Sequence, residues 1–341
     1  MTTTSSSTST PSVISRPVSS GGFRLSRLFS QEFVLALVIV GLSLLVSLIN
    51  PRFLGGDNLN AILSNSSYIA VAAIGMSMVI ISGNIDISVG SLIGLLATIA
   101  GRLAVGAEAG GYPLIVAFII PLIVGVILSG VNGFFVAYLR VPSIVVTLGM
   151  MSILKGGLIL WTGGEWIYNL PPGFQIAQQK PLGIPLPIYV MVVLTVLAAL
   201  WLRYSSTGRS IYAVGGNPEA ARLSGISEKG VIMRVFMING LMVGVASLLF
   251  ATQFNAIQST VPSGLELLII TASVVGGVSI LGGTGTVIGS TLGAILIHVI
   301  PSAMIFASIS DYWRQAVQGL LILITVLADL YRRRRQLYTS K

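Results

Sequence analysis

Few residues in this chain are suited to chemistry, and one carboxylate is the most conspicuous of them. Asp86 lies in a polar break, residues 82–90, between two apolar runs, with Asn84 and Ser88 beside it. A charge within apolar sequence is costly to bury and normally faces a partner or a cavity. An aspartate just before a new apolar run is also typical of a helix start, where its oxygens accept from free amides. Two interpretations therefore stay open: a structural cap, and a role in a path or its gating.

Other isolated polar groups are weaker candidates. Trp161 and Asn255 lie near the ends of apolar runs, where they could stack on or hydrogen-bond a polar ligand, although interfacial aromatics and wetted helix ends are commoner. His298, the single histidine, lies within an apolar run, where packing explains it better than a proton relay. Because one histidine and no cysteine cannot form a multi-ligand metal site, we expect no metal site and no catalytic residue.

A second break, residues 279–286, is rich in glycine. A phosphate-binding loop of the Walker type needs Gly-Lys-Ser/Thr. The four lysines all lie elsewhere: Lys155, Lys180, Lys229 and Lys341. We interpret the segment as a tight turn, and we expect no ATP site and no cofactor in this chain.

The longest polar stretch between apolar runs, residues 204–230, contains the signal of a short helix. Asn217 is a favourable N-cap, Pro218 suits the first helical position, and Glu219 suits the positive end of the helix. Gly225 ends it, which predicts about two turns over residues 218–224. The residues expected to be presented are Ala220, Ala221 and Leu223. A helix so short is marginal alone in water, so it must dock on its own membrane domain or in a groove of another protein.

The elements that must hold these residues are membrane-spanning helices. The 341 residues are 54% hydrophobic and only 9% charged, whereas soluble proteins are about 25% charged. A soluble enzyme is therefore excluded, and repeated apolar runs of about 20 residues predict an all-α polytopic membrane protein. About ten spans are predicted, with broken or re-entrant segments among them: 33–49, 67–82, 87–106, 113–138, 142–162, 188–203, 231–252, 265–281, 286–306 and 313–331.

The positive charges predict the topology. An even number of spans places both ends on one side, and most Lys and Arg residues fall in loops of that side, which the positive-inside rule makes cytoplasmic. The net charge of +9 is then a topology signal and an attraction to anionic lipid, with no nucleic acid involved. We expect residues 1–30 to be a disordered cytoplasmic Ser/Thr-rich tail, 31–331 the membrane domain, and 332–341 a basic cytoplasmic tail.

A short internal echo links two of the predicted helix starts. Residues 89–94 (VGSLIG) resemble residues 288–293 (IGSTLG), and each opens a span after a break. Small residues four apart allow close helix packing in lipid; the alternative is a duplicated half, as many transporters have. With ten full spans the two copies would share one orientation, whereas a re-entrant segment counted as a span would invert them.

Four segments, in order, resemble the permease subunits of ribose-type ATP-binding-cassette (ABC) importers. They are GNIDISVG at 83–90, VPSIVVTLG at 141–149, GGNPEAARLSGI at 215–226, and GGVS at 276–279 followed by GGTGT at 282–286. The resemblance extends over about residues 30–331. It departs from the family at Asn84, where many relatives have a second glycine.

The resemblance implies a multi-pass permease of the bacterial inner membrane that pairs with a second permease subunit, identical or paralogous, around a central path. A cytoplasmic ABC ATPase would bind ATP and Mg²⁺, and a periplasmic binding protein would deliver a monosaccharide or similar small polar solute. The segment near residue 220 would be the helix that couples to the ATPase. The implied coupling residues are Gly216, Asn217, Pro218, Glu219, Ala220, Ala221, Arg222, Leu223, Ser224 and Gly225.

The rival interpretation is an ion- or proton-coupled secondary sugar transporter. Such a protein needs buried carboxylates or histidines placed for ion exchange. Asp86 is the only attractive candidate, and the patterned stretch 204–230 would then have no purpose.

Overall fold

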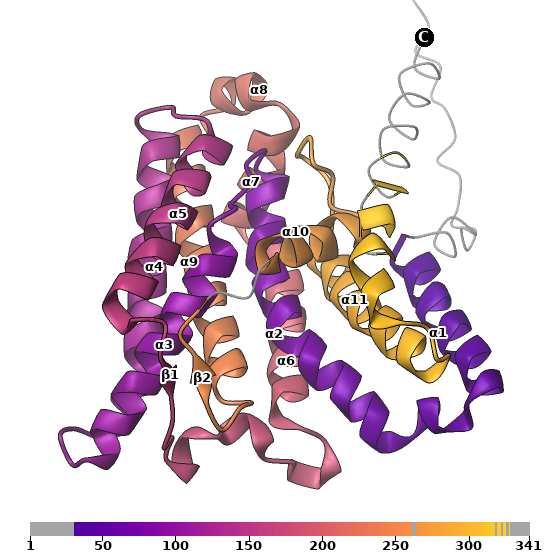
Figure 1. Cartoon of the computed structure of the whole chain (residues 1–341). Helices are drawn as coiled ribbons and strands as arrows, with labels where there is room; N and C mark the ends of the chain where they lie inside the picture. Colours follow the sequence, from indigo (N-terminus) through magenta and orange to yellow (C-terminus); the bar gives the residue numbers. More distant parts are fainter. Residues whose placement is uncertain (1–30, 261–263, 318, 322, 325–326, 328–341) are drawn as a thin grey trace, which may run out of the picture.

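The computed structural model describes residues 31–260, 264–317, 319–321, 323–324 and 327. The predicted tails, 1–30 and 332–341, lie outside the described residues, as does part of the last predicted span, 313–331. The described chain is a bundle of helices (Figure 1), which confirms the prediction of an all-α polytopic membrane protein.

Within the described ranges, eight helices are long and apolar enough to cross a membrane, and each matches a predicted span. They are α1 (Gln31–Ile49), α2 (Gly56–Ile81), α3 (Val89–Glu108), α4 (Ile115–Ala137), α5 (Ser143–Thr162), α6 (Leu186–Tyr204), α9 (Glu228–Ala251) and α11 (Val287–Phe306). α2 begins well before the predicted span 67–82, because the polar residues ahead of the apolar run continue the same helix.

The predicted span 265–281 is wrong as one continuous helix. α10 (Leu265–Val275) has 11 residues, about 16 Å at 1.5 Å per residue, which is too short for a hydrocarbon layer of about 30 Å. It ends at Gly276, and Gly277, with φ of +98°, leads into a hairpin over residues 276–286. The chain still passes from one end of the bundle to the other between α9 and α11 (Figure 1), so this is a broken crossing.

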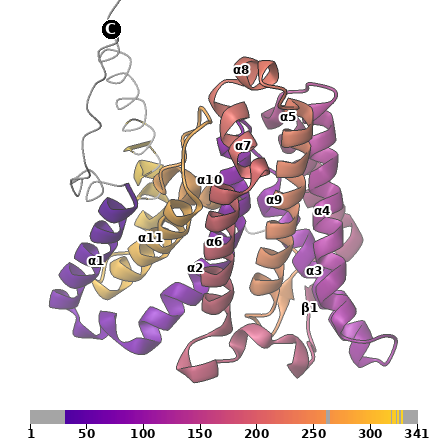
Figure 2. The same cartoon turned by 180° about the vertical axis from the view of Figure 1, so that it is seen from behind.

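The two ends of the bundle are built differently (Figures 1 and 2). At one end α7 (Ser206–Gly216) and α8 (Pro218–Leu223) connect α6 to α9; we call it the α8 end. At the other, the β end, β1 (Trp166–Ile167) pairs antiparallel with β2 (Ile257–Gln258). Short 3₁₀ turns complete the described elements: Pro51–Leu54, Pro172–Phe174, Ile176–Gln178, Pro181–Gly183 and Asp311–Trp313.

α2 forms the centre of the bundle. Its residues 69–81 are buried, with α6, α9, α10 and α11 packed around them. Glycine allows close contact between α4 and α9. Gly125 of α4 and Gly240 of α9 face each other, and a Cβ on either would overlap the carbonyl oxygen of the other. Such contacts let helices approach closely where no hydrophobic force from water drives them together.

The two copies of the internal echo share one orientation, as the count of ten crossings predicted. α3 and α11 both run from the α8 end to the β end (Figure 1). Gly289 and Gly293 of α11 lie against the backbone of α10, and Gly90 of α3 lies against Glu266 in the first turn of α10. The glycines of both copies thus allow their helices to pack closely on α10.

Candidate functional site

The predicted short helix is present and lies at the outer edge of the α8 end (Figure 1). α8 covers Pro218–Leu223, one residue shorter than predicted. The Asn217 side chain accepts from the Ala220 amide at 3.0 Å. Gly225, with φ of +79°, turns the chain so that the next amide donates to the Ala221 carbonyl at 3.0 Å. Since local sequence caps both ends, this short helix is held in shape.

The surface that α8 presents differs from the prediction at one residue. Ala221 is buried, with 4% of its surface exposed, because α8 lies along α7 and the start of α9 and one side of it must face them. Ala220 is exposed and Leu223 is 82% exposed. Glu219 and Arg222 form an exposed ion pair at 2.6 Å. The exposed face of α8 thus consists of Glu219, Ala220, Arg222 and Leu223.

α7 was missed by the sequence-based prediction, which treated residues 206–216 as loop. Two signals were available: Ser205 as an N-cap, whose hydroxyl accepts from the Gly208 amide at 2.8 Å, and apolar Ile211 and Val214 three residues apart. Both apolar side chains are buried in the main core. A helix with several glycines has low intrinsic stability, so α7 depends on packing that the sequence does not show.

Glycines join α7 to both breaks by backbone contact. A Cβ at Gly215 would collide with the carbonyl oxygen of Ile81, at the end of α2, and would lie 2.8 Å from the Gly283 amide. That amide donates to the same Ile81 oxygen at 2.8 Å. A Cβ at Gly282 would in turn lie 3.1 Å from the Cα of Gly83. We call Gly83, Gly215, Gly216, Gly282 and Gly283 the glycine junction.

Asp86 is fully buried and bonded at both oxygens. Oδ1 accepts from the Ser88 amide at 3.0 Å and the Ser88 hydroxyl at 2.5 Å, and Oδ2 accepts from Asn239 Nδ2 at 2.9 Å. Asn132 Nδ2 donates to the Ser88 hydroxyl at 2.9 Å. We call these four residues the Asp86 cluster. It ties the first break to α4 and α9 and closes the turn that begins α3.

Asn132 and Asn239 were missed by the sequence-based prediction. Each is an Asn-Gly pair inside an apolar run, and a lone amide within a span signals a polar contact between helices. In the part of the chain that the structure describes, their Oδ1 atoms are buried without a hydrogen-bond partner. Such an atom costs about 1–3 kcal/mol, so the Asp86 cluster is incompletely satisfied in this conformation.

The four segments that carry the family resemblance meet at the α8 end. The first break is tied to the segment 141–149, because the Ile85 amide donates to Ser143 Oγ at 3.2 Å and Thr147 Oγ1 donates to the Ile85 carbonyl at 3.4 Å. The glycine junction ties the same break to the other two segments. Residues far apart in the chain thus form one connected site.

The remaining predicted residues do not all lie there. Asn84 stays within the first break, half-buried. Trp161 is at the β end of α5, half-exposed, with the Arg102 guanidinium 4.5 Å from its ring centre. Asn255 follows α9 at the β end, where its Oδ1 accepts from Gln178 Nε2 at 2.9 Å.

The chain is similar in sequence to known transport proteins. The family described as "Branched-chain amino acid transport system / permease component" matches residues 58–326. Similar proteins include the "Autoinducer 2 import system permease protein LsrC" of Enterobacter sp. (strain 638), 36% identical over 303 residues, which are 88% of this chain and 87% of that protein. The LsrC proteins of Salmonella typhi and Escherichia coli (strain K12 / DH10B) are 36% and 34% identical over 301 residues, 88% of this chain and 86% and 87% of theirs.

No solved structure matches the chain. The family match covers all four segments that meet at the α8 end. The resemblance to ABC importer permeases is thereby confirmed: the chain belongs to the family of transport-system permease components.

Proposed function

We propose that this permease subunit carries a monosaccharide or similar small polar solute into a bacterial cell, driven by a separate ABC ATPase. The family description names branched-chain amino acids, whereas the similar proteins are named for autoinducer 2 import. We favour the sugar-like class because the similarity to those importers extends along 88% of this chain. The proposal of an ATPase as energy source rests on one observation: the exposed face of α8 is joined to both breaks through the glycine junction. We infer that this face is the surface on which the ATPase docks.

The α8 end is cytoplasmic in this proposal, together with both termini. The described cations are in excess at the α8 end, which is the bias expected of a cytoplasmic face. Those at the α8 end are Arg140, Arg203, Arg209, Arg222, Lys229 and Arg234, and those at or near the β end are Arg52, Arg102, Lys180 and Arg314. Because the chain has no cysteine, single cysteines report topology cleanly. The cysteine of Arg209→Cys, at an exposed position, should not react with an impermeant thiol reagent added outside intact cells, whereas that of Arg52→Cys should react. Reaction of Arg209→Cys but not of Arg52→Cys would mean that the topology is inverted.

The coupling step follows from the position of α8. When the ATPase closes on ATP and Mg²⁺, its movement would shift α8, and α7 would transmit that shift to the glycine junction. The residues 216–225 have this role as a unit: Ala220, Leu223, Glu219 and Arg222 face the ATPase, and Asn217, Pro218, Ser224 and Gly225 keep the helix in shape. Energy reaches the membrane only if these contacts differ between two states.

We expect Asp86 and its cluster to act in gating. Among the described residues, the amide oxygens of Asn132 and Asn239 have no hydrogen-bond partner. We infer that either amide can exchange partners in a second arrangement while Asp86 keeps a donor. Ser88 and Asn84 would move with the break. Trp161 and Asn255 would contact solute or its surroundings at the opposite, external end.

The test uses the complete importer: this chain, its ATPase, a second permease subunit and its binding protein, in proteoliposomes. Ala220→Glu places a charge on the exposed face of α8 and should abolish ATP-driven sugar uptake and solute-stimulated ATP hydrolysis. Ser206→Glu adds the same charge to exposed Ser206 of α7 and should leave both unchanged. Uptake by Ala220→Glu at the normal rate, or uptake by the chain alone driven by an ion gradient, would contradict the proposal.

A further inference from the structure

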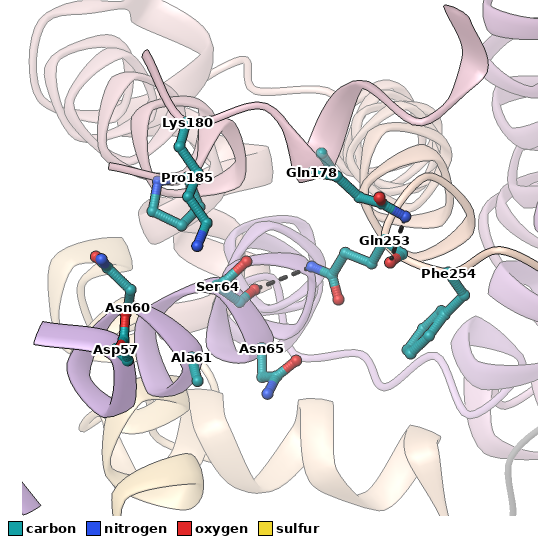
Figure 3. Close-up of a pocket in the computed structure, with 11 residues that line it drawn as sticks. Asp57, Asn60, Ala61, Ser64, Asn65, Gln178, Lys180, Pro185, Gln253 and Phe254 are labelled. Atoms are coloured by element: carbon teal, nitrogen blue, oxygen red, sulfur yellow. Dashed lines mark hydrogen bonds between the residues drawn. The ribbon is translucent and has the colours of Figure 1, made fainter. Parts of the chain in front are cut away.

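A polar recess opens at the β end, away from the α8 end. It lies between the first turns of α2, the 3₁₀ turns that precede α6, and the residues that follow α9 (Figure 3). Its volume is about 600 Å³, within the range of 300–1,000 Å³ typical of small-molecule pockets. None of its described lining residues belongs to the four segments that meet at the α8 end.

The lining favours a neutral ligand with hydroxyl groups. Amides of Asn60, Asn65, Gln178 and Gln253 surround it together with Ser64. Each amide offers both donors and acceptors, as a hydroxyl does, so the two kinds of group pair without a net charge.

An aromatic ring and a balanced pair of charges complete the recess. The Phe254 ring gives an apolar wall on which the C–H face of a sugar ring could rest. One carboxylate, Asp57, and one ammonium, Lys180, are both exposed. Since their charges are opposite, the recess selects neither an anion nor a cation.

Hydrogen bonds between separate elements hold the recess in shape. Gln253 Nε2 donates to the Ser64 carbonyl at 3.1 Å, which ties the end of α9 to α2 (Figure 3). Gln178 Nε2 donates to the Gln253 carbonyl at 3.3 Å and to Asn255 Oδ1 at 2.9 Å. Asn255, a candidate from the sequence, therefore positions Gln178. Groups held in this way lose little freedom when a ligand binds.

A second cavity lies beside the recess. Its volume is about 410 Å³, it shares Ala61, Asn65 and Phe254 with the recess, and its lining also includes Tyr68 and His298. Asp57, Ser64 and Tyr68 lie near one face of α2, because they are spaced by about two turns and then one.

We propose that this recess is an outer contact site for a small, neutral, polyhydroxylated solute entering the permease. The inference rests on the proposed function, which it extends by giving the solute a binding surface on this chain. The side chains that touch the solute are those of Asn60, Ser64, Asn65, Gln253 and Phe254.

The first test is protection of a single cysteine, which the cysteine-free chain makes clean. Asn65→Cys in the complete importer is treated with a water-soluble methanethiosulfonate reagent, with or without D-ribose, L-arabinose or leucine. Arg52→Cys, exposed at the β end and outside the recess, is the matched control. We expect a saturating sugar to slow modification of Asn65→Cys about tenfold and to leave Arg52→Cys unaffected.

Other outcomes overturn the inference. No protection by either sugar, or equal protection by leucine, would exclude a polyol site. Protection by the solute-free binding protein but by no sugar would make the recess a protein-docking surface. Protection of the cysteine needs no ATP, so this test of the recess does not depend on ATP-driven transport. The proposed function would instead be contradicted if the wild-type importer showed no ATP-dependent sugar uptake.

A second test separates binding from turnover. Asn60→Ala with Asn65→Ala removes two amides and should raise the KM for sugar uptake about tenfold, the effect of one or two lost hydrogen bonds, with kcat within twofold. Leu59→Ala, on the same helix and outside the recess, should leave both unchanged. A double variant with an unchanged KM would contradict the site.

Discussion

The two glycine-containing breaks at the α8 end begin helices that run in the same direction, yet they are fixed in different ways. The first, residues 82–90, is held by side chains: Asp86 bonds to Ser88 and to Asn239. The second, residues 279–286, is held mainly by backbone contact: the Gly283 amide donates to the Ile81 carbonyl, and Gly282 lies beside Gly83.

The difference indicates two mechanical roles. A side-chain network can exchange partners without moving the backbone far, which suits a gate. Backbone packed on backbone has no side chain to yield, so a displacement on one side passes to the other. Gly215 of α7 contacts Gly283 of the second break and Ile81, the residue that precedes the first break, and Gly282 lies beside Gly83. We therefore infer that the second break transmits movement and that the first responds to it.

The largest effect should come from filling the backbone contact. Gly215→Ala places a methyl group on the Ile81 carbonyl oxygen, and we expect the free energy of unfolding to fall by about 3 kcal/mol, the upper range for overpacking. Gly216→Ala is the control, since its Cβ would have no neighbour nearer than 3.9 Å. Thermal unfolding in detergent measures both. If both variants lost the same unfolding free energy, the close backbone contact at Gly215 would not be what stabilises this junction.

The next effect should come from the side-chain network. Asp86→Ala leaves buried donors of Ser88 and Asn239 without an acceptor, which should lower the free energy of unfolding by about 2 kcal/mol. Thr284→Ala, at an exposed position of the second break, should cost almost nothing. If Asp86→Ala had the melting temperature of the wild type and took up solute normally, the proposed gating role of the Asp86 cluster would be contradicted.

A smaller effect is expected where α7 meets the second break through one side chain. The Tyr212 hydroxyl donates to the Gly285 carbonyl at 2.9 Å, so Tyr212→Phe should cost about 1 kcal/mol. Burial raises the pKa of Tyr212 above its ordinary value of 10.0. Folding therefore favours the protonated tyrosine. The contribution of Tyr212 to the free energy of unfolding is complete below pH 10 and is lost as the pH rises through the folded-state pKa. The measurement is the free energy of unfolding as a function of pH. If Tyr212→Phe showed the same alkaline loss of stability as the wild type, Tyr212 would not be its cause.

The smallest effect on stability should come from the exposed face of α8. Arg222→Ala breaks the ion pair with Glu219, but both side chains are about two-thirds exposed, and such pairs contribute about 0–1 kcal/mol. We expect an unchanged melting temperature together with weaker co-purification of the ATPase. A large loss of stability would mean that α8 serves the fold more than a partner.

Much of the fold could be predicted from the sequence. Eight of the predicted spans match long apolar helices, because about 20 consecutive apolar residues have few stable alternatives in a bilayer. α8 could be predicted within one residue, because Asn217, Pro218 and Gly225 act on their neighbours in the chain. α10 could not, because its apolar run continues past Gly276, where close packing on α11 and the hairpin end the helix.

The candidate site divides in the same way. Asp86 was selected from the sequence because a carboxylate between apolar runs is costly and therefore rare. Asn239, which donates to Asp86, and Asn132, which donates to Ser88, lie far along the chain from this break, and nothing local assigns them to the Asp86 cluster. The burial of Ala221 and the recess beside Asn65 depend in the same way on which elements pack together.

Composition and local patterning by themselves determined that this chain spans a membrane many times and displays a capped short helix between two spans. Those features follow from transfer free energies and from hydrogen bonds within a few residues, which the order of amino acids specifies directly. Only the tertiary structure decided that the two breaks, far apart in the chain, meet where Gly282 lies against Gly83. It also decided that Asp86 bonds to Asn239 of α9 and that a polar recess opens at the opposite end. Those features depend on contacts between distant segments, whose positions are set by the packing of the whole bundle.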